Sequence, residues 1–187
     1  LPADDGDIVT VDIIVQPKFR PQPTGKITEV IGQHMAPGME IDIAIKSFGI
    51  PAIWPSSFEK TVESIPQEVR NSDRSCRFNL THLPFVTIDG EDARDFDDAV
   101  YCEPLHGGGW KLYVAIADVS HYVKPESPLD IEANNRATSV YFPDHVVPML
   151  PEILSNGLCS LNPQVDRLCM VCEMEVSAQG LVESSRF

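Results

Sequence analysis

The sequence predicts a mixed α+β fold, in which a partial antiparallel β-barrel is followed by the N-terminal part of a larger mixed domain. Short β-branched segments separated by proline and glycine occupy residues 1–50, which is typical of a small antiparallel barrel or sandwich. From residue 83 to residue 187, apolar strand-like segments flank one polar, helix-compatible stretch. Between these parts, prolines and a rise in Ser, Glu and Arg indicate a linker over residues 51–82.

Three strands are expected in the first part of the chain. Residues 9–15 and 26–31 are rich in β-branched side chains, and residues 40–45 (Glu-Ile-Asp-Ile-Ala-Ile) alternate between polar and apolar types. Residues 17–25 contain three prolines and one glycine, which predicts a turn between the first two strands. Three strands are too few to close a barrel, so we expect this module to be incomplete.

Two hairpins and a helix are expected in the second part. Three consecutive glycines at 107–109 form a tight connection between two apolar segments, and Pro128 lies just upstream of the helix-compatible stretch. The predicted strands are residues 85–88, 99–102, 110–117 and 167–176 and a strand from 181 onward, and the predicted helix is residues 130–137. A short strand is therefore expected on either side of the most acidic stretch of the chain.

Composition restricts the class of protein. A hydrophobic content of 43% is enough for a sizeable core, and the apolar runs are far shorter than the roughly 18 residues of a membrane span. We therefore expect a cytoplasmic protein without a membrane association. The net charge of −14 argues mildly against an RNA partner, because phosphate neutralisation drives nucleic-acid binding. Bound divalent cations would offset part of this charge, and the basic surface can lie elsewhere in a longer protein.

The cysteines are expected to be reduced and structural. Their number is odd, and three of them lie inside apolar runs, which suits buried thiols better than a disulfide framework. Cys169 and Cys172 have the CxxC spacing of metal and redox sites. No second pair completes a zinc site, and residues three apart in a strand point to opposite faces, so the structural interpretation is preferred. The five are Cys76, Cys102, Cys159, Cys169 and Cys172.

The most informative feature is a dense cluster of carboxylates between two apolar segments. Such a concentration of like charge is unfavourable unless water or a cation screens it. Ile88 directly precedes the cluster and Ala99-Val100 directly follows it, which places the carboxylates at the edge of a sheet. Its members are Asp89, Glu91, Asp92, Asp95, Asp97 and Asp98.

The ligand types favour a hard cation if a metal binds here. Oxygen donors without nearby Cys or His suit Mg²⁺, with Mn²⁺ as the alternative. An EF-hand is excluded, because counting from Asp89 the sixth position is not glycine and the twelfth is not glutamate. Three interpretations stay open on these residues alone: a phosphoryl-transfer metal site, a solvated acidic loop, and a structural cation site.

Five blocks of the sequence resemble a known family in the correct order. Residues 87–99 are similar to the signature of the ribonuclease II superfamily catalytic domain. Their amino-acid pattern resembles the ribonuclease R branch of the ribonuclease II/ribonuclease R family. Residues 1–50 resemble the latter part of the cold-shock (OB-like) barrel that precedes this domain. The other four blocks are residues 114–120, 141–143, 148–151 and 154–161.

This resemblance implies a processive 3′→5′ exoribonuclease. The implied reaction is Mg²⁺-assisted hydrolysis of single-stranded RNA, and of structured RNA with a single-stranded 3′ end, to nucleoside 5′-monophosphates. The family's four aspartates match Asp89, Asp95, Asp97 and Asp98, with spacings of six, two and one. By resemblance, Asp89, Asp95 and Asp98 are metal ligands, and Asp97 together with Asp95 is catalytic. Tyr141 matches the tyrosine that packs against the 3′-terminal nucleotides.

Two other functions and the extent of the chain complete the expectations. A non-catalytic RNA-binding module and a scaffold that retains a nuclease-like fold are the alternatives, and the intact aspartate quartet argues against the scaffold. We expect the chain to be a piece of a longer, monomeric protein without a small-molecule cofactor, and to show little nuclease activity by itself. Asp118, which ends the apolar strand at 110–117, is a further candidate for supporting the site, whereas His121 is expected to be a satisfied surface histidine.

Overall fold

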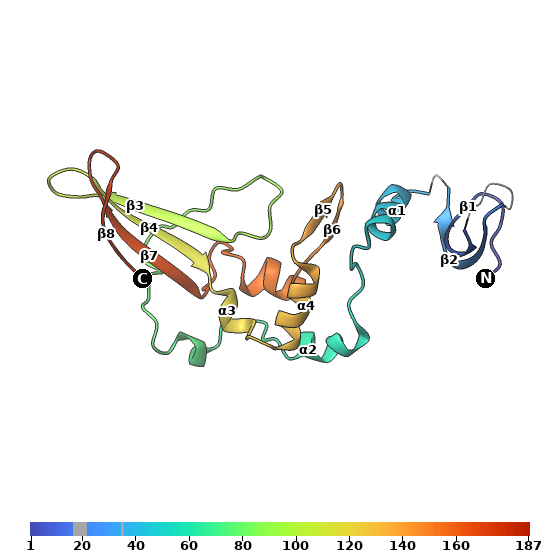
Figure 1. Ribbon diagram of the computed structural model, residues 1–187. Coiled ribbons are helices and arrows are strands. Elements are labelled where there is room, and N and C mark those ends of the chain that lie inside the picture. The colour runs from blue at the N-terminus through green and yellow to red at the C-terminus, as the bar shows by residue number, and fades with distance from the viewer. Residues whose placement is uncertain (17–21, 35) are drawn as a thin grey trace. The chain divides into compact units, whose positions relative to one another are not determined.

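The computed structural model describes residues 1–16, 22–34 and 36–187, which form two compact units (Figure 1). Unit 1 comprises Leu1–Ile53 and Phe142–His145, and unit 2 comprises Trp54–Tyr141 and Val146–Phe187. Part of the turn predicted at 17–25 lies outside the described residues. No helix in the described part of the chain is long and apolar enough to cross a membrane.

Unit 1 contains an antiparallel pair of strands and one helix. β1 (Asp7–Val15) pairs with β2 (Thr24–Gln33), with Asp7 opposite Gln33, so the first two predicted strands are confirmed. The third is wrong, because residues 40–45 belong to helix α1 (Met39–Phe48). Its buried residues are Met39, at its first position, and Ile45, toward its end. Gly49, in the left-handed conformation at φ 62°, caps the helix by donating its N–H to the last-turn carbonyls.

Unit 2 is built on a four-stranded antiparallel sheet in the order β3-β4-β7-β8 (Figure 1). The strands are β3 (Asp98–Pro104), β4 (Trp110–Ala117), β7 (Cys169–Val176) and β8 (Val182–Arg186). Both predicted hairpins are therefore confirmed, and β4 lies next to β7 although about fifty residues separate them in sequence. The strand predicted at 85–88 is reduced to a single bridge between Val86 and Val100.

Unit 2 also contains short helices and part of a small hairpin, whose residues Phe142–His145 belong to unit 1. The helix predicted at 130–137 is α4 (Pro128–Arg136), and it begins with the Ser127 side chain accepting a hydrogen bond from the Asp130 N–H. The other elements are the 3₁₀ turns η1 (Ser56–Phe58) and η2 (Asn71–Arg74), the helices α2 (Glu59–Glu63) and α3 (Val119–Tyr122), the strands β5 (Val140–Phe142) and β6 (His145–Val147), and the π-helix η3 (Ile153–Leu158).

The hydrophobic core of unit 2 lies around η3 and α4. Leu154 and Leu158 of η3 are almost completely buried, and they pack with residues from β4, α4 and the segment that follows η3. The segment 51–82 also contributes to this core through Phe58, Ile65 and Val69. Burial of these apolar side chains anchors η3 directly behind the loop that carries the aspartates.

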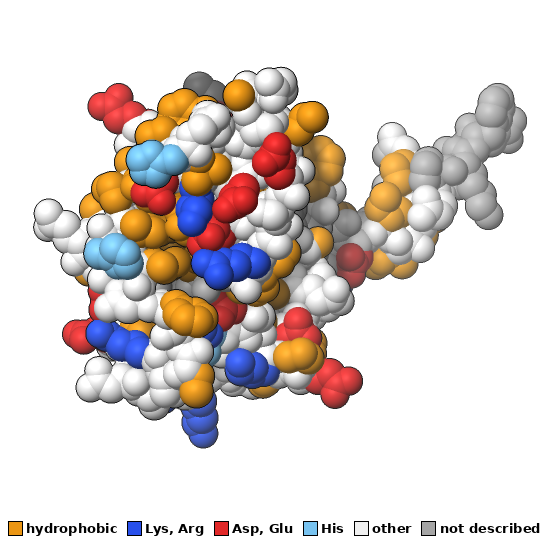
Figure 2. Space-filling model, turned by 90° about the vertical axis from the view of Figure 1, so that its left-hand side faces the viewer, with side chains coloured by type: hydrophobic (Ala, Val, Ile, Leu, Met, Phe, Trp, Pro, Cys, Tyr) orange, Lys and Arg blue, Asp and Glu red, His pale blue; other side chains and the backbone are white. Residues whose placement is uncertain are grey.

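The face of the molecule drawn in Figure 2 has a mixed character. Lysine and arginine side chains are interspersed there with acidic and apolar side chains, so positive charge is not gathered into one continuous surface on that face. The strong negative charge of the chain, −14 in total, is thus accompanied by scattered basic groups.

Candidate active site

The aspartates lie on a loop that enters the sheet at β3. Val86 bridges Val100 at the start of this loop, and Asp98 is the first residue of β3. The Asp97 carbonyl accepts a hydrogen bond of 2.9 Å from the Ala117 N–H at the end of β4. Backbone pairing therefore fixes the end of the loop, and Asp97 and Asp98 are held at the edge of the sheet, as the sequence predicts.

A fully buried serine holds the middle of the loop. The Ser160 hydroxyl donates to the Arg94 carbonyl at 2.7 Å and accepts from the Phe96 N–H at 3.0 Å. The Leu161 N–H donates to the Phe96 carbonyl at 2.8 Å. Asp95 is thus flanked on both sides by peptide groups fixed from the segment after η3. Sequence reasoning placed residue 160 in a family block but gave it no role.

Three of the predicted aspartates act electrostatically on the fourth, Asp97. Partial burial raises the pKa of Asp97, and the negative charges of Asp95, Asp98 and Asp89 raise it further. The charges that raise this pKa are those of the three other predicted aspartates, so all four predicted residues belong to one electrostatic cluster. Asp92, in the same loop, does not contribute to this shift. Asp89, Asp97 and Asp98 remain exposed, so solvent and ions can reach them.

Tyr141 of β5 contacts this cluster through its hydroxyl, which donates a hydrogen bond of 2.5 Å to Oδ2 of Asp95. This hydrogen bond, together with burial and the Asp95 charge, raises the pKa of Tyr141. Tyr141 is nevertheless 62% exposed. One end of the side chain is therefore tied to the aspartate cluster, and much of its surface is available to a ligand.

The chemistry of this donor set fits a hard divalent cation, because it consists of carboxylates at a solvent-accessible edge. The side chains do not form a ready ligand shell. Across residues 1–16, 22–34 and 36–187, no three Asp, Glu, His or Cys side chains are arranged so that they could hold a metal ion. Coordination by the aspartates would therefore require rotation of side chains that are mostly exposed, while the loop backbone is already fixed.

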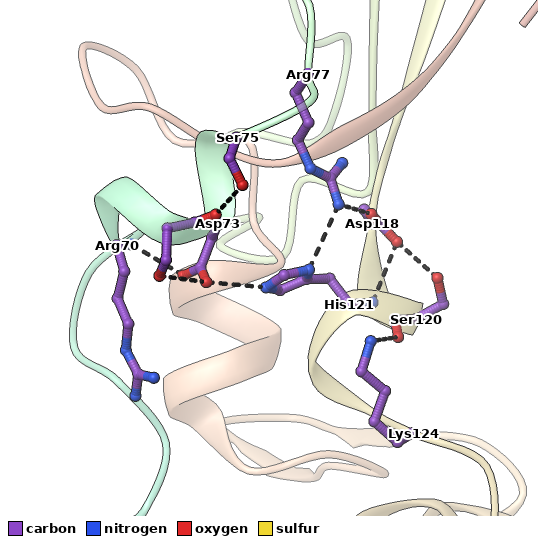
Figure 3. Close-up of polar contacts among 9 residues, drawn as sticks. Arg70, Asp73, Ser75, Arg77, Asp118, Ser120, His121 and Lys124 are labelled. Atoms are coloured by element: carbon purple, nitrogen blue, oxygen red, sulfur yellow. Dashed lines mark hydrogen bonds and ion pairs between the residues drawn. The ribbon is translucent and has the colours of Figure 1, made fainter.

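Asp118 belongs to a separate polar network (Figure 3). Its carboxylate accepts hydrogen bonds from Arg77 at 2.6 Å, from the Ser120 hydroxyl at 2.7 Å and from the His121 N–H at 3.2 Å. Burial raises the pKa of Asp118, but these hydrogen bonds and the Arg77 charge outweigh burial and hold it below its usual value. Asp118 therefore caps α3 and anchors Arg77.

His121 is part of the same network (Figure 3). Its Nε2 lies 3.5 Å from a carboxylate oxygen of Asp73, and its Nδ1 lies 3.4 Å from Arg77. The ring also packs edge-on against Tyr122. The side chain is only 26% exposed, so His121 is satisfied by its neighbours, as expected, but it is more buried than a surface histidine.

The cysteines are free thiols, and Cys169 and Cys172 lie on β7. Cys159 is buried, Cys169 and Cys172 are half-buried, and Cys76 and Cys102 are exposed. The expectation of buried thiols therefore holds fully for Cys159 and partly for Cys169 and Cys172, and it is wrong for Cys76 and Cys102, which lie at the surface.

Comparison with known proteins defines the class. Residues 77–187 match the RNB domain family, and residues 1–55 match the cold shock domain family CSD2. The RNB match covers more than half of the chain, which therefore belongs to the RNB domain family. The predicted fold class, a cold-shock-like module followed by the start of a ribonuclease II-type domain, is confirmed.

Within this class, the chain is similar to bacterial ribonuclease R. It is 59% identical over 182 residues to Ribonuclease R of Escherichia coli (strain K12), and the match covers 97% of this chain and 22% of the relative. The chain therefore spans about one fifth of that protein. It also superposes on Mycoplasma genitalium RNase R in complex with double-stranded RNA, with a TM-score of 0.87 and 34% identity, over 97% of this chain and 32% of that one.

The same fold occurs in a protein described as a pseudonuclease. Yeast Ssd1 superposes with a TM-score of 0.70 at 18% identity, over 97% of this chain and 23% of that one. At this identity the likeness concerns the fold alone. The case for catalysis must therefore rest on the side chains of the aspartate cluster.

Proposed function

We propose that this chain carries the aspartate centre of a 3′→5′ exoribonuclease that hydrolyses RNA to nucleoside 5′-monophosphates with the help of Mg²⁺. One observation carries the proposal: the other three aspartates of the family signature act electrostatically on Asp97, and hydrogen bonds fix the backbone of the loop on either side of Asp95. A solvated acidic loop would not need its peptide groups held by a fully buried serine. The similarity to ribonuclease R supports RNA as the substrate.

Asp89, Asp95 and Asp98 would hold the metal, with Mg²⁺ preferred over Mn²⁺. A bound divalent ion supplies polarisation of the phosphate, activation of a water molecule and stabilisation of the leaving 3′-oxygen. Asp97 lies among these residues, and we assign the chemical step to its carboxylate, with Asp95 in support. The fixed loop backbone keeps the carboxylates near their working positions, which reduces the ordering needed when substrate binds.

Tyr141 would grip the 3′-terminal nucleotide. Its hydroxyl is occupied by Asp95, so the ring is the part left to meet RNA. Stacking on an aromatic ring holds any base without reading its identity, which suits an enzyme that removes nucleotides in succession. The hydrogen bond between Tyr141 and Asp95 would keep the nucleotide-binding ring beside the aspartates, as cleavage at the RNA terminus requires.

A degradation assay tests the proposal on the complete protein that contains this chain. A 5′-labelled single-stranded RNA should shorten stepwise from its 3′ end in Mg²⁺, the shortening should stop in EDTA, and chromatography should identify 5′-monophosphates. A matched duplex with a single-stranded 3′ overhang tests whether structured RNA is also degraded. The isolated 187-residue chain is expected to show little activity in the same assay.

The outcomes separate the candidate functions. RNA binding in EDTA without Mg²⁺-dependent shortening would favour the non-catalytic RNA-binding module. Neither binding nor shortening would favour a scaffold that shares the fold, as the likeness to the pseudonuclease allows. Internal cleavage without 3′ shortening would keep the hydrolase but contradict the exonucleolytic mode.

A further inference from the structure

We infer that Ser160 is a positioning residue for Asp95, acting through the backbone of the aspartate loop and not through substrate. This inference rests on the proposed function, since it assigns Ser160 a part in the same site. Ser160 is completely buried, with 0% exposure. A buried hydroxyl needs partners, and this one has two, on either side of Asp95.

The hydroxyl bridges the two peptide groups that flank Asp95. It donates to the Arg94 carbonyl at 2.7 Å and accepts from the Phe96 N–H at 3.0 Å. Both hydrogen bonds join residues more than sixty positions apart in sequence. They therefore fix the direction in which the Asp95 side chain leaves the backbone, while Tyr141 holds its carboxylate.

Ser160 is itself held rigidly. Its N–H donates to the Gly157 carbonyl at 3.1 Å, and its carbonyl accepts from the Asn162 N–H at 2.8 Å and from Nε of Arg167 at 2.9 Å. It follows the π-helix η3, whose wide turn is closed by the Cys159 N–H donating to the Leu154 carbonyl at 2.8 Å. Irregular turns of this type recur at functional sites, and here the turn ends at the residue that clamps the loop.

Without the hydroxyl, the aspartate loop loses its central fixed point. The Arg94 carbonyl and the Phe96 N–H lose their partner inside the fold, while the Leu161 hydrogen bond and the Ala117 hydrogen bond remain. Because Asp89 and its neighbours up to Asp92 are exposed, the loop is free to move toward solvent, where water replaces the lost partner. A shift of about 1 Å in a positioned group is enough to slow a reaction about 10²-fold.

The test compares Ser160→Ala with Ser155→Ala in the complete protein. Ser155 lies on η3 itself, and among the residues that the structure describes its hydroxyl hydrogen-bonds the side chain of the adjacent Asn156 at 3.4 Å. Ser160→Ala is expected to slow single-turnover 3′ cleavage about 10- to 100-fold with unchanged RNA affinity, and Ser155→Ala to leave the rate unchanged. Titration with Mn²⁺, followed by electron paramagnetic resonance, should show weaker binding to Ser160→Ala only.

A double-mutant cycle with Asp95→Asn separates positioning from general loss of structure. If Ser160 acts through Asp95, Ser160→Ala should lower the single-turnover cleavage rate by less than about twofold in the Asp95→Asn background. The reason is that the residue positioned by Ser160 is already impaired there. An equal loss in both backgrounds would overturn the inference, as would a Ser160→Ala variant with the cleavage rate and Mn²⁺ affinity of Ser155→Ala.

Two further arms keep the test decisive if Ser160→Ala does not fold or if the proposed function fails. If Ser160→Ala does not fold, Ser160→Cys keeps a similar volume with a weaker donor. Ser160→Cys should then lower the cleavage rate by less than the 10- to 100-fold expected for Ser160→Ala. Cleavage at the wild-type rate by Ser160→Cys would contradict the inference. If the wild-type protein does not degrade RNA, the proposed function fails. The Mn²⁺ affinities of the same variants then decide whether Ser160 positions Asp95. Equal affinities for Ser160→Ala and Ser155→Ala would overturn that inference.

Discussion

Arg136, at the end of α4, offers a sharp test of how unit 2 is held together. It is 6% exposed, and its Nε forms an ion pair of 2.9 Å with Glu132, which is 9% exposed. Its Nη1 donates to the Pro148 carbonyl at 3.1 Å. The guanidinium carbon lies 3.4 Å from the centre of the Trp54 ring. One side chain therefore joins α4, the segment after β6 and the start of unit 2.

Arg136→Ala is expected to destabilise unit 2 by about 3–5 kcal/mol, because breaking a buried ion pair leaves the Glu132 charge without compensation. Arg136→Ala also removes the cation–π contact with Trp54, which is worth about 2 kcal/mol when desolvated. This loss is not added to the 3–5 kcal/mol, because the contributions of contacting residues are not additive. Replacing both partners, as Arg136→Met with Glu132→Leu, should recover most of the loss, since well-packed apolar residues can substitute for a buried pair.

Urea unfolding followed by tryptophan fluorescence measures this effect, because Trp54 stacks on Phe58 at 4.9 Å and contacts Arg136. Arg74→Ala is the matched control. Arg74 pairs with Asp166 at 2.8 Å, but about half of each side chain is exposed, so its loss should cost about 0–1 kcal/mol. If Arg136→Ala costs no more than Arg74→Ala, the buried network does not stabilise unit 2 and the reasoning is refuted.

Three further predictions concern single side chains. Tyr141→Phe, which keeps the ring and loses the hydrogen bond to Asp95, should slow cleavage about tenfold at unchanged RNA affinity. Tyr141→Ala should also weaken RNA binding by about 1–3 kcal/mol, and equal affinities in a filter-binding assay would contradict a stacking role. Because the pKa of Asp118 is lowered from 3.8, its stabilising effect is complete above that pH and is lost as the pH falls through the folded-state pKa. Melting curves of Asp118→Asn should therefore be less sensitive to acid, and a slope equal to that of wild type would argue against this linkage. Burial raises the pKa of Cys159 to about 12, so iodoacetamide at pH 8 should modify it only after unfolding, and mass spectrometry showing labelling of the native protein would contradict this.

The local elements of unit 2 could be predicted because their signals are local. Three glycines join β3 to β4, and the cap at Ser127 with Pro128 marks the start of α4. The wrong prediction of a strand at residues 40–45 also came from a local signal. Three isoleucines at alternate positions fit a strand, but glycines at 38 and 49 bracket a helix of ten residues between them. A short apolar alternation does not distinguish the two.

The aspartates and Tyr141 could be selected as candidates from the sequence because they lie in motifs that resemble the family's, whereas the residues that contact and support them could not. Ser160 contacts Arg94 and Phe96, which lie more than sixty residues away in the sequence. No residue spacing in the sequence predicts these contacts. The same holds for Arg136, whose partners include a backbone carbonyl and an aromatic ring. Residues that hold a site in place are determined by tertiary packing, so they become visible only in the folded chain.

If the Asp97 carboxylate carries out the chemical step on RNA, its loss should slow nucleotide release without weakening RNA binding. In the complete protein, RNA affinity and single-turnover release of nucleotides are measured for wild type, Asp97→Asn and Asp92→Asn. Asp92→Asn is the matched control, because it makes the same chemical change in the same loop at a residue whose charge is not among those that raise the pKa of Asp97. We expect unchanged RNA affinity in all three proteins and at least about a 10³-fold slower release for Asp97→Asn alone. Release at the wild-type rate by Asp97→Asn would show that the catalytic centre has been assigned to the wrong residue.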